Sequence, residues 1–258
     1  MKYDLKNITF LIPLRIDSMV RLENLLMTVE YLMRHFETCI FVLQADKYEN
    51  DIVPHFLGKK VKYCFVEDYD TVFYRTKYLN QRTREADTQF LGIWDADVIV
   101  PYKQVIDSLD KLQEAYEIAY PFDGHFYDTT DIVREMYLKN RQLKILESNQ
   151  HKMNLTYSER SIGGAFMVNR QAYIEAGMEN EEFYGWGPED WERFERWRTF
   201  AYKIYRAKGN LYHLSHSRGS NSMHRSPEQF VNTNKRCKLT ALSNAEDLNS
   251  IRKWQNIQ

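Results

Sequence analysis

Two aspartates, Asp95 and Asp97, interrupt an otherwise apolar run over residues 90–101. An apolar run of this length is typical of a strand that is buried on both faces. In an extended chain, alternation places side chains two residues apart on the same side of the strand. Two carboxylates held together in this way repel each other, and Mg²⁺ or Mn²⁺ would relieve that repulsion through oxygen coordination. The competing interpretation of so short a motif is an ordinary surface turn after a strand.

A second pair of carboxylates ends the stretch at residues 182–190. Two glycines flank Trp186, so this loop is expected to bend and to display a large aromatic side chain. Pro188 suits the first turn of a helix, which places Glu189 and Asp190 in that turn. Their charges would complement the helix dipole in any protein. The same location keeps a carboxylate ionised, as a general base requires.

Two histidines, His213 and His216, lie in the last apolar segment before the polar C-terminal region. Three residues apart in an extended segment, they face the same way only if the chain turns. A structural role and a metal-ligand role are both open for them.

Upstream, Gly163 and Gly164 precede another apolar run, where they permit either a close backbone approach to a ligand or a simple bend.

The apolar pattern also predicts the elements that would position these residues. Strands are expected at residues 8–14, 40–43, 61–66, 90–97 and 165–168, helices at 22–36, 71–86, 101–117, 131–147 and 188–204, a polar loop at 149–160 and a terminal helix within 227–258. Strands that alternate with helices predict an α/β fold, with a mostly parallel central sheet flanked by helices. Ligands of such sheets bind outside the carboxyl ends of the strands, where Arg15, Asp17, Asp95 and Asp97 all fall.

Composition narrows the class of protein. The 258 residues suffice for one large domain or two small ones, and 43% hydrophobic with 28% charged residues is typical of a globular protein. A net charge of -1 does not produce the positive electrostatic potential that attracts nucleic acid, so no nucleic-acid partner is expected. Three cysteines without metal-like spacing fit a reducing compartment. No stretch is typical of a signal peptide, and no run approaches the ~18 apolar residues of a transmembrane helix.

The ordered set of motifs resembles inverting glycosyltransferases of the GT-A (nucleotide-diphospho-sugar transferase) fold. The set comprises Arg15 after residues 12–14, the run 73–80, the aspartate motif 95–97, the glycine pair within 162–165, the block 184–190 and the segment 216–218. The pattern is most similar to the β-1,4-galactosyltransferase group and to bacterial capsule or lipopolysaccharide family 2-type transferases. The likeness runs from about residue 8 to residue 218. It implies a catalytic domain over residues 1–225, with a nucleotide-binding half at about 1–100 and an acceptor half at about 101–225, followed by a helical tail at 226–258.

The resemblance implies a role for each matching residue. Asp190 would be the general base and Glu189 would hold a sugar hydroxyl. Asp97, His213 and His216 would ligate Mn²⁺ or Mg²⁺. The donor would be contacted by Arg15, Asp17, Phe73, Arg75, Lys77, Asp95, Gly164 and Trp186, with Phe73 against the uracil ring and Trp186 covering donor and acceptor.

The implied activity is metal-dependent, inverting transfer of a hexose or N-acetylhexosamine, galactose-type favoured, from a UDP-sugar to a carbohydrate hydroxyl. Surface polysaccharide synthesis is the expected setting, in the cytoplasm, or at the inner membrane face if the acceptor is lipid-linked. One alternative is a degenerate transferase that binds a sugar nucleotide or glycan without turnover. A sugar-nucleotide pyrophosphorylase would need a glycine-rich loop after the first strand, which residues 13–17 lack. Pro188, where the family often has glycine, leaves the sugar and the acceptor undecided.

Overall fold

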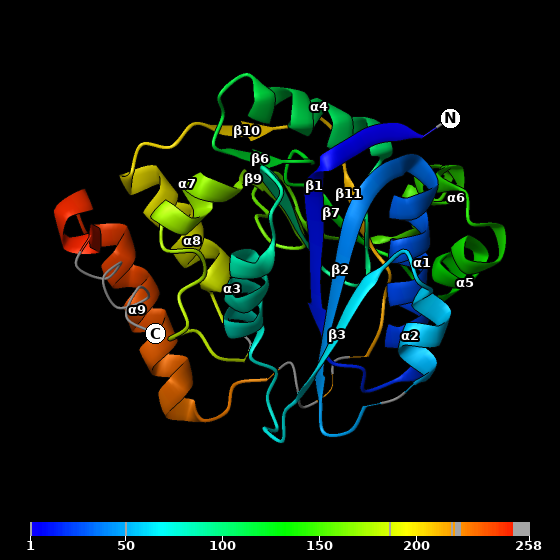
Figure 1. The fold of residues 1–258 in the computed structure, drawn as a ribbon, viewed down its shortest axis with the longest axis horizontal. Coiled ribbons are helices and arrows are strands. Elements are labelled where there is room, and N and C mark those ends of the chain that lie inside the picture. Colours follow the sequence, from blue (N-terminus) through cyan, green and yellow to red (C-terminus); the bar gives the residue numbers. More distant parts are fainter. Residues whose placement is uncertain (1, 50, 186, 218, 220–222, 250–258) are drawn as a thin grey trace.

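The structure is a computed structural model that describes residues 2–49, 51–185, 187–217, 219 and 223–249. Within these residues, seven strands form a central sheet in the order β10-β6-β9-β4-β1-β2-β3 (Figure 1). Their bounds are β1 Tyr3–Leu14, β2 Phe36–Asp46, β3 Lys62–Glu67, β4 Phe90–Trp94, β6 Ile118–Tyr120, β9 Ala165–Asn169 and β10 Ile204–Arg206. The pairs β1–β2, β2–β3, β1–β4 and β6–β10 are parallel, and β9 runs antiparallel to both β4 and β6. The prediction of a mostly parallel sheet is confirmed.

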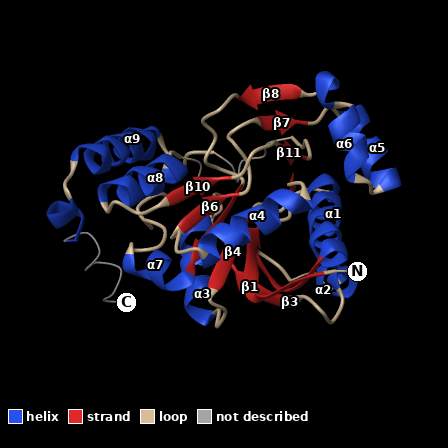
Figure 2. Ribbon diagram, turned by 90° about the horizontal axis from the view of Figure 1, so that it is seen from above, coloured by secondary structure: helices blue, strands red, loops and turns tan. Residues whose placement is uncertain are grey.

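Helices cover both faces of this sheet, with α1 on one side and α3 and α7 on the other (Figure 2). Their bounds are α1 Met19–His35, α2 Ile52–Leu57, α3 Arg75–Glu85, α4 Tyr102–Gln113, α7 Arg170–Glu175, α8 Glu189–Thr199 and α9 Pro227–Leu242. Helix α9, in the C-terminal part of the chain, packs against α8 at the periphery of the molecule (Figure 1). None of the described helices combines the length and the apolar character that crossing a bilayer requires.

A second, smaller sheet lies beside helices α5 (Asp131–Asn140) and α6 (Leu143–Ser148) (Figure 2). Its described strands follow the order β5-β11-β7-β8, with β5 at Val98–Ile99, β7 at Phe126–Asp128, β8 at Asn154–Tyr157 and β11 at Leu211–His213. Strand β11 pairs antiparallel with β5, so that His213 lies opposite Val98. This pairing places the histidine segment beside the aspartate motif.

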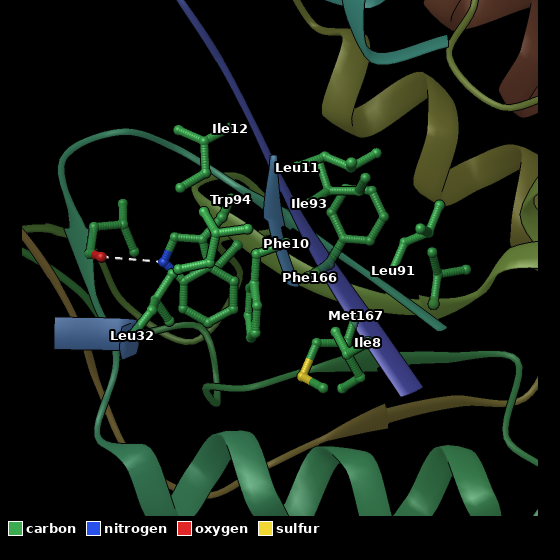
Figure 3. Close-up of a cluster of buried hydrophobic side chains, with 14 of the residues drawn as sticks. Ile8, Phe10, Leu11, Ile12, Leu32, Leu91, Ile93, Trp94, Phe166 and Met167 are labelled. Atoms are coloured by element: carbon green, nitrogen blue, oxygen red, sulfur yellow. Dashed lines mark hydrogen bonds between the residues drawn. The ribbon is translucent and has the colours of Figure 1, made fainter. Parts of the chain in front are cut away.

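Core side chains pack β1 against β4 next to Asp95 and Asp97. Phe10 of β1 and Trp94 of β4 meet edge to face with ring centroids 5.2 Å apart, and both are almost fully buried (Figure 3). Gly92 makes room for this contact, because a Cβ atom there would lie 2.6 Å from the Phe10 ring. The Trp94 indole N–H donates to the Val98 carbonyl at 3.1 Å, the dashed line in Figure 3. The chain is therefore fixed on both sides of Asp95 and Asp97.

The structure corrects several predicted elements. Asp95 leaves the strand and Asp97 lies in a turn, so extended alternation does not relate their side chains. The helix expected at 131–147 is interrupted at Arg141, which has a left-handed φ of 54°. The helix expected at 188–204 ends at Thr199, and Ile204 belongs to β10. The polar loop expected at 149–160 contains β8, and α2 was not predicted at all.

Candidate active site

A cleft of about 810 Å³ lies at the carboxyl ends of β1 and β4. Its walls come from both sheets, from the glycine pair after β8 and from the first turn of α8. Most residues that the sequence singled out line this cleft together: Arg15, Phe73, Arg75, Asp95, Asp97, Gly164, Glu189, Asp190, His213 and His216. Of the four residues expected to converge at strand ends, Arg15, Asp95 and Asp97 line the cleft, whereas Asp17 does not.

Three side chains in the cleft could hold a metal ion. One ligand atom each from Asp97, His213 and His216 lies within 4.8 Å of the others. Asp97 Oδ2 is 3.0 Å from His216 Nε2, and Oδ1 is 3.5 Å from His213 Nε2. Burial opposes ionisation of Asp97, but the two imidazoles hold its pKa well below its ordinary value. One anionic oxygen ligand thus faces two imidazole nitrogens.

The far side of each imidazole ring is also occupied. His213 Nδ1 lies 2.8 Å from Asp128 Oδ1, and His216 Nδ1 lies 2.8 Å from the Ser217 carbonyl oxygen. Burial would lower the pKa of His213, but Asp97 and Asp128 raise it to about 10. Contacts of this kind fix the tautomer of a metal-binding histidine and direct Nε2 toward the metal. Asp128 was not identified from the sequence.

The backbone between the two histidines is braced by buried polar contacts. The Leu214 amide donates to the Asp97 carbonyl at 2.7 Å, and the Leu214 carbonyl accepts from the Asn24 side chain at 2.8 Å. Arg134 of α5 donates in turn to Asn24 Oδ1 at 2.8 Å. Both Asn24 and Arg134 are buried. This chain of contacts supplies the turn that lets both imidazoles face Asp97.

Two arginines that line the cleft, Arg15 and Arg75, are paired with acidic residues. Arg75 donates to Asp95 at 2.8 Å. Burial raises the pKa of Asp95, while the Arg75 guanidinium opposes that rise. Arg15 donates to Asp68 at 2.7 Å and to the Ala45 and Asp70 carbonyls at 3.0 and 2.6 Å. Arg15 therefore fixes the loop before α3 in addition to lining the cleft.

Two predicted donor residues within the described part of the chain, Asp17 and Lys77, do not line the cleft. Asp17 forms an ion pair with Arg21 at 3.0 Å, and of the two only Arg21 lines the cleft. Lys77 is exposed, and its ammonium lies 5.8 Å from the centroid of the Tyr74 ring. Trp186 lies outside the described residues.

Glu189 and Asp190 begin α8, as predicted, and both line the cleft. Asp190 Oδ1 accepts from Arg193 at 2.5 Å. The second oxygen, Oδ2, packs so closely on Gly163 that a Cβ atom there would lie 2.6 Å away. Glu189 Oε2 is buried without a hydrogen-bond partner. Burial, together with the neighbouring Asp190 charge, raises the pKa of Glu189 to about 8.

The raised pKa of Glu189 predicts a pH-dependent stability. The folded protein keeps a proton on Glu189 up to about pH 8, whereas the unfolded chain releases it near its ordinary pKa of about 4.3. The stabilising contribution is therefore fully present below the unfolded pKa and is lost as pH rises through about 8. Glu189→Gln should remove this loss, so that urea unfolding at pH 5 and pH 9 differs less than in the wild type. The exposed Glu228→Gln serves as control, and a Glu189→Gln variant with the wild-type pH profile would contradict the prediction.

Part of the chain matches a known protein family. Residues 144–217 match a family model described as the N-terminal domain of galactosyltransferase, a range that includes Glu189, Asp190, His213 and His216. A comparison with curated protein sequences finds no match.

Solved structures share the architecture, among them the following two. The catalytic domain of Drosophila β1,4-galactosyltransferase 7, in complex with xylobiose, superposes with a TM-score of 0.56 at 16% identity, covering 89% of this chain and 79% of that one. Glucosyl-3-phosphoglycerate synthase from Mycobacterium tuberculosis, in complex with Mn²⁺, UDP and phosphoglyceric acid, gives 0.51 at 13% identity, covering 90% and 79%. The chain has the GT-A glycosyltransferase fold, and the predicted resemblance is confirmed.

Proposed function

We propose that this protein is a metal-dependent inverting glycosyltransferase, which transfers a hexose or N-acetylhexosamine from a UDP-sugar to a carbohydrate hydroxyl. The observation that carries the proposal is one cleft that contains both the Asp97–His213–His216 cluster and Asp190. The galactosyltransferase family match over residues 144–217 favours galactose-type donors. The Mycobacterium tuberculosis neighbour, which was solved with Mn²⁺ and UDP, supports the choice of metal and nucleotide.

The donor set fits Mn²⁺, with Mg²⁺ as the second choice. Asp97 supplies a carboxylate oxygen, and His213 and His216 supply imidazole nitrogens, a mixed set that suits a borderline divalent ion. The Nδ1 contacts of both rings leave Nε2 available for coordination. When bound, the ion would stabilise the negative charge that develops on the departing diphosphate.

The donor is proposed to bind along the edge formed by β1, the loop before α3 and β4. Phe73, which lines the cleft and stacks on Tyr78 at 5.6 Å, is suited to pack against the uracil ring. Arg75, held by Asp95, is suited to face the nucleotide or its phosphates. Gly164 has a φ of 86° and lines the cleft, where it would border the sugar.

Asp190 is proposed to act as the general base. Its carboxylate would accept the proton of the acceptor hydroxyl while that oxygen attacks the anomeric carbon from the face opposite the diphosphate. The anomeric configuration is inverted, and UDP leaves with the electrons of the broken bond. Glu189, which its raised pKa keeps protonated near neutral pH, would hydrogen-bond a sugar hydroxyl.

The acceptor is proposed to be a glycan of surface polysaccharide synthesis, bound by the half of the chain at about 101–225. Tyr157 and Trp191 are exposed by about half and both line the cleft, where aromatic faces suit sugar rings. We propose a cytoplasmic location, at the inner membrane face where the acceptor is lipid-linked.

Product analysis tests the proposal. The protein would be incubated with Mn²⁺, a glycan acceptor and UDP-galactose, UDP-glucose, UDP-N-acetylglucosamine or UDP-N-acetylgalactosamine, and both UDP release and the anomeric proton of the product would be followed by NMR. We expect UDP-galactose to react fastest and to give a β-linked product from the α-linked donor. Binding of the donor without transfer across the panel would support a sugar-nucleotide-binding protein instead, and an α-linked product would exclude inversion.

The contacts from Asn24 to the Leu214 carbonyl and from Arg134 to Asn24, called here the brace, predict a remote effect on metal affinity. Asn24→Ala removes the side chain that fixes the Leu214 carbonyl, so the two imidazoles lose their shared orientation. We expect the affinity for Mn²⁺ to fall by about 10- to 100-fold, as for other outer contacts of metal ligands. Electron paramagnetic resonance titration of Mn²⁺ measures the effect.

The control is Thr28→Ala, which changes another buried polar residue of α1, one turn further along the helix. Its hydroxyl has no hydrogen-bond partner in the described structure. This variant should bind Mn²⁺ like the wild type. Equal affinity of Asn24→Ala and the wild type would show that the brace does not orient the ligands.

A further inference from the structure

A fully buried arginine stands directly behind the proposed base. Arg193 follows Asp190 by three residues on α8, and its side chain is 0% exposed. Its guanidinium donates to Asp190 Oδ1 at 2.5 Å and to the two oxygens of Glu179 at 2.9 and 2.8 Å. It also packs 4.2 Å from the centroid of the Phe166 ring. One guanidinium therefore joins a core carboxylate to a carboxylate in the cleft.

The partner of Arg193 is itself anchored in the core. Glu179 is buried, and its Oε1 accepts from the Tyr173 hydroxyl at 2.6 Å. Its backbone amide donates to Asn80 Oδ1 at 2.9 Å, and its carbonyl accepts from Asn80 Nδ2 at 2.9 Å. A buried ion pair contributes little net stability on average, although removal of one partner is strongly destabilising. Among the described residues Arg193 Nε has no hydrogen-bond partner, so the arrangement is held by the bonds from Nη1 to Glu179 and from Nη2 to Asp190.

The other oxygen of the Asp190 carboxylate is confined from the opposite side. Oδ2 lies against the Cα atom of Gly163, in a space that a Cβ atom would fill to within 2.6 Å. The carboxylate is thus held between the Arg193 guanidinium and the glycine pair that lines the cleft. A group held on two sides keeps one orientation, which a base must have to meet an acceptor hydroxyl.

We propose that Arg193, anchored by Glu179, is a positioning residue that holds Asp190 in its reactive orientation. This inference rests on the proposed function, in which Asp190 accepts the proton of the acceptor hydroxyl. Arg193 donates to Oδ1 and so leaves Oδ2, on the Gly163 side, as the oxygen that receives the proton. Lysine cannot replace it, because a single ammonium does not reproduce the planar fork that reaches two carboxylates at once.

The first test is Arg193→Lys, assayed for kcat and for KM of donor and acceptor. We expect kcat to fall by about 10- to 100-fold, as a misplacement of about 1 Å does, with donor KM changed less than about threefold. Gly163→Ala displaces the same carboxylate without touching the buried pair, and should lower kcat in the same way. A kcat within twofold of the wild type for either variant would overturn the proposal.

A matched control comes from the next turn of the same helix. Arg196 is also buried and pairs with buried Glu192 at 3.0 Å, but its hydrogen bonds go to Glu192 and to the Ala176 and Met178 carbonyls. Arg196→Lys should lower the melting temperature about as much as Arg193→Lys while leaving kcat within about threefold. Similar losses of kcat in both variants would indicate general destabilisation and would overturn the positioning role.

A double-mutant cycle separates positioning from packing. In the Asp190→Asn background the base is gone, so Arg193→Lys should change the residual kcat less than about threefold, because coupled residues are non-additive. An equal loss in both backgrounds would contradict the proposal. Crystal structures of the wild type and Arg193→Lys show the orientation of the Asp190 carboxylate independently of activity. In the variant, this carboxylate should be rotated away from Gly163. A wild type that transfers no sugar would refute the proposed function, while an unmoved carboxylate would refute this inference.

Discussion

Asp190→Asn is expected to lower kcat by about 10²- to 10⁴-fold, the usual cost of removing a general base. Asparagine keeps the shape of the side chain and an oxygen for the Arg193 guanidinium, which donates to Oδ1 in the wild type at 2.5 Å. The metal cluster and Phe73 are untouched, so the affinity for UDP-sugar should stay within about threefold. Steady-state UDP release measures kcat, and isothermal titration measures donor affinity.

The control for this variant is Glu195→Gln on the same helix. Glu195 pairs with Arg198 at 3.1 Å and does not line the cleft. Its loss should leave kcat unchanged. An Asp190→Asn variant with wild-type kcat would assign the base to another residue, and Glu189 would be the first to examine.

Asp97→Ala is expected to abolish metal-dependent binding of the nucleotide. Asp97 is the anion that faces both histidines, at 3.0 Å from His216 and 3.5 Å from His213. Outer contacts of metal ligands are worth about 10- to 100-fold in affinity, so loss of the ligand itself should exceed about 100-fold. Mn²⁺ titration by electron paramagnetic resonance, followed by UDP titration with and without Mn²⁺, measures the loss.

Three variants with different expected losses of Mn²⁺ affinity test this prediction more stringently. Asp128→Asn alters only the contact behind His213, 2.8 Å from Nδ1, and should weaken Mn²⁺ binding less than Asp97→Ala does. His216→Ala should resemble Asp97→Ala. If Asp97→Ala binds Mn²⁺ as tightly as the wild type, the cluster is not the metal site.

The parts of the site that follow buried strands could be predicted from the sequence. The apolar runs before Arg15 and Asp95 are local signals, and parallel strands place their carboxyl ends at one edge. The first turn of α8 was predictable for the same reason, because Pro188 and the two carboxylates after it are a local pattern.

The second sheet could not be predicted in this way. Its described strands β5 and β11 have two and three residues, too few to show a period, and their pairing depends on contacts between distant segments. Only the family resemblance predicted that His213 and His216 lie beside Asp97. The alternation argument for Asp95 and Asp97 was wrong because the chain leaves the strand at Asp95 and turns.

The contacts that support the site residues were not predicted from the sequence, although the position of Arg193 was a local signal for one of them. Arg193 precedes Trp197 by four residues, so a charge falls on the apolar face of a predicted helix, and such a charge needs a buried partner. Nothing local marks Glu179, Asn24 or Asp128 as the partner of a site residue, since each meets its partner only through the tertiary fold.

The most direct measurement of the central claim is UDP release from UDP-galactose in the presence of a glycan acceptor, before and after EDTA. Release should require Mn²⁺ or Mg²⁺, stop when EDTA is added, return when Mn²⁺ is restored, and be absent in Asp97→Ala. Release at the same rate with EDTA, or in Asp97→Ala, would contradict an account in which Asp97, His213 and His216 hold the metal for sugar transfer.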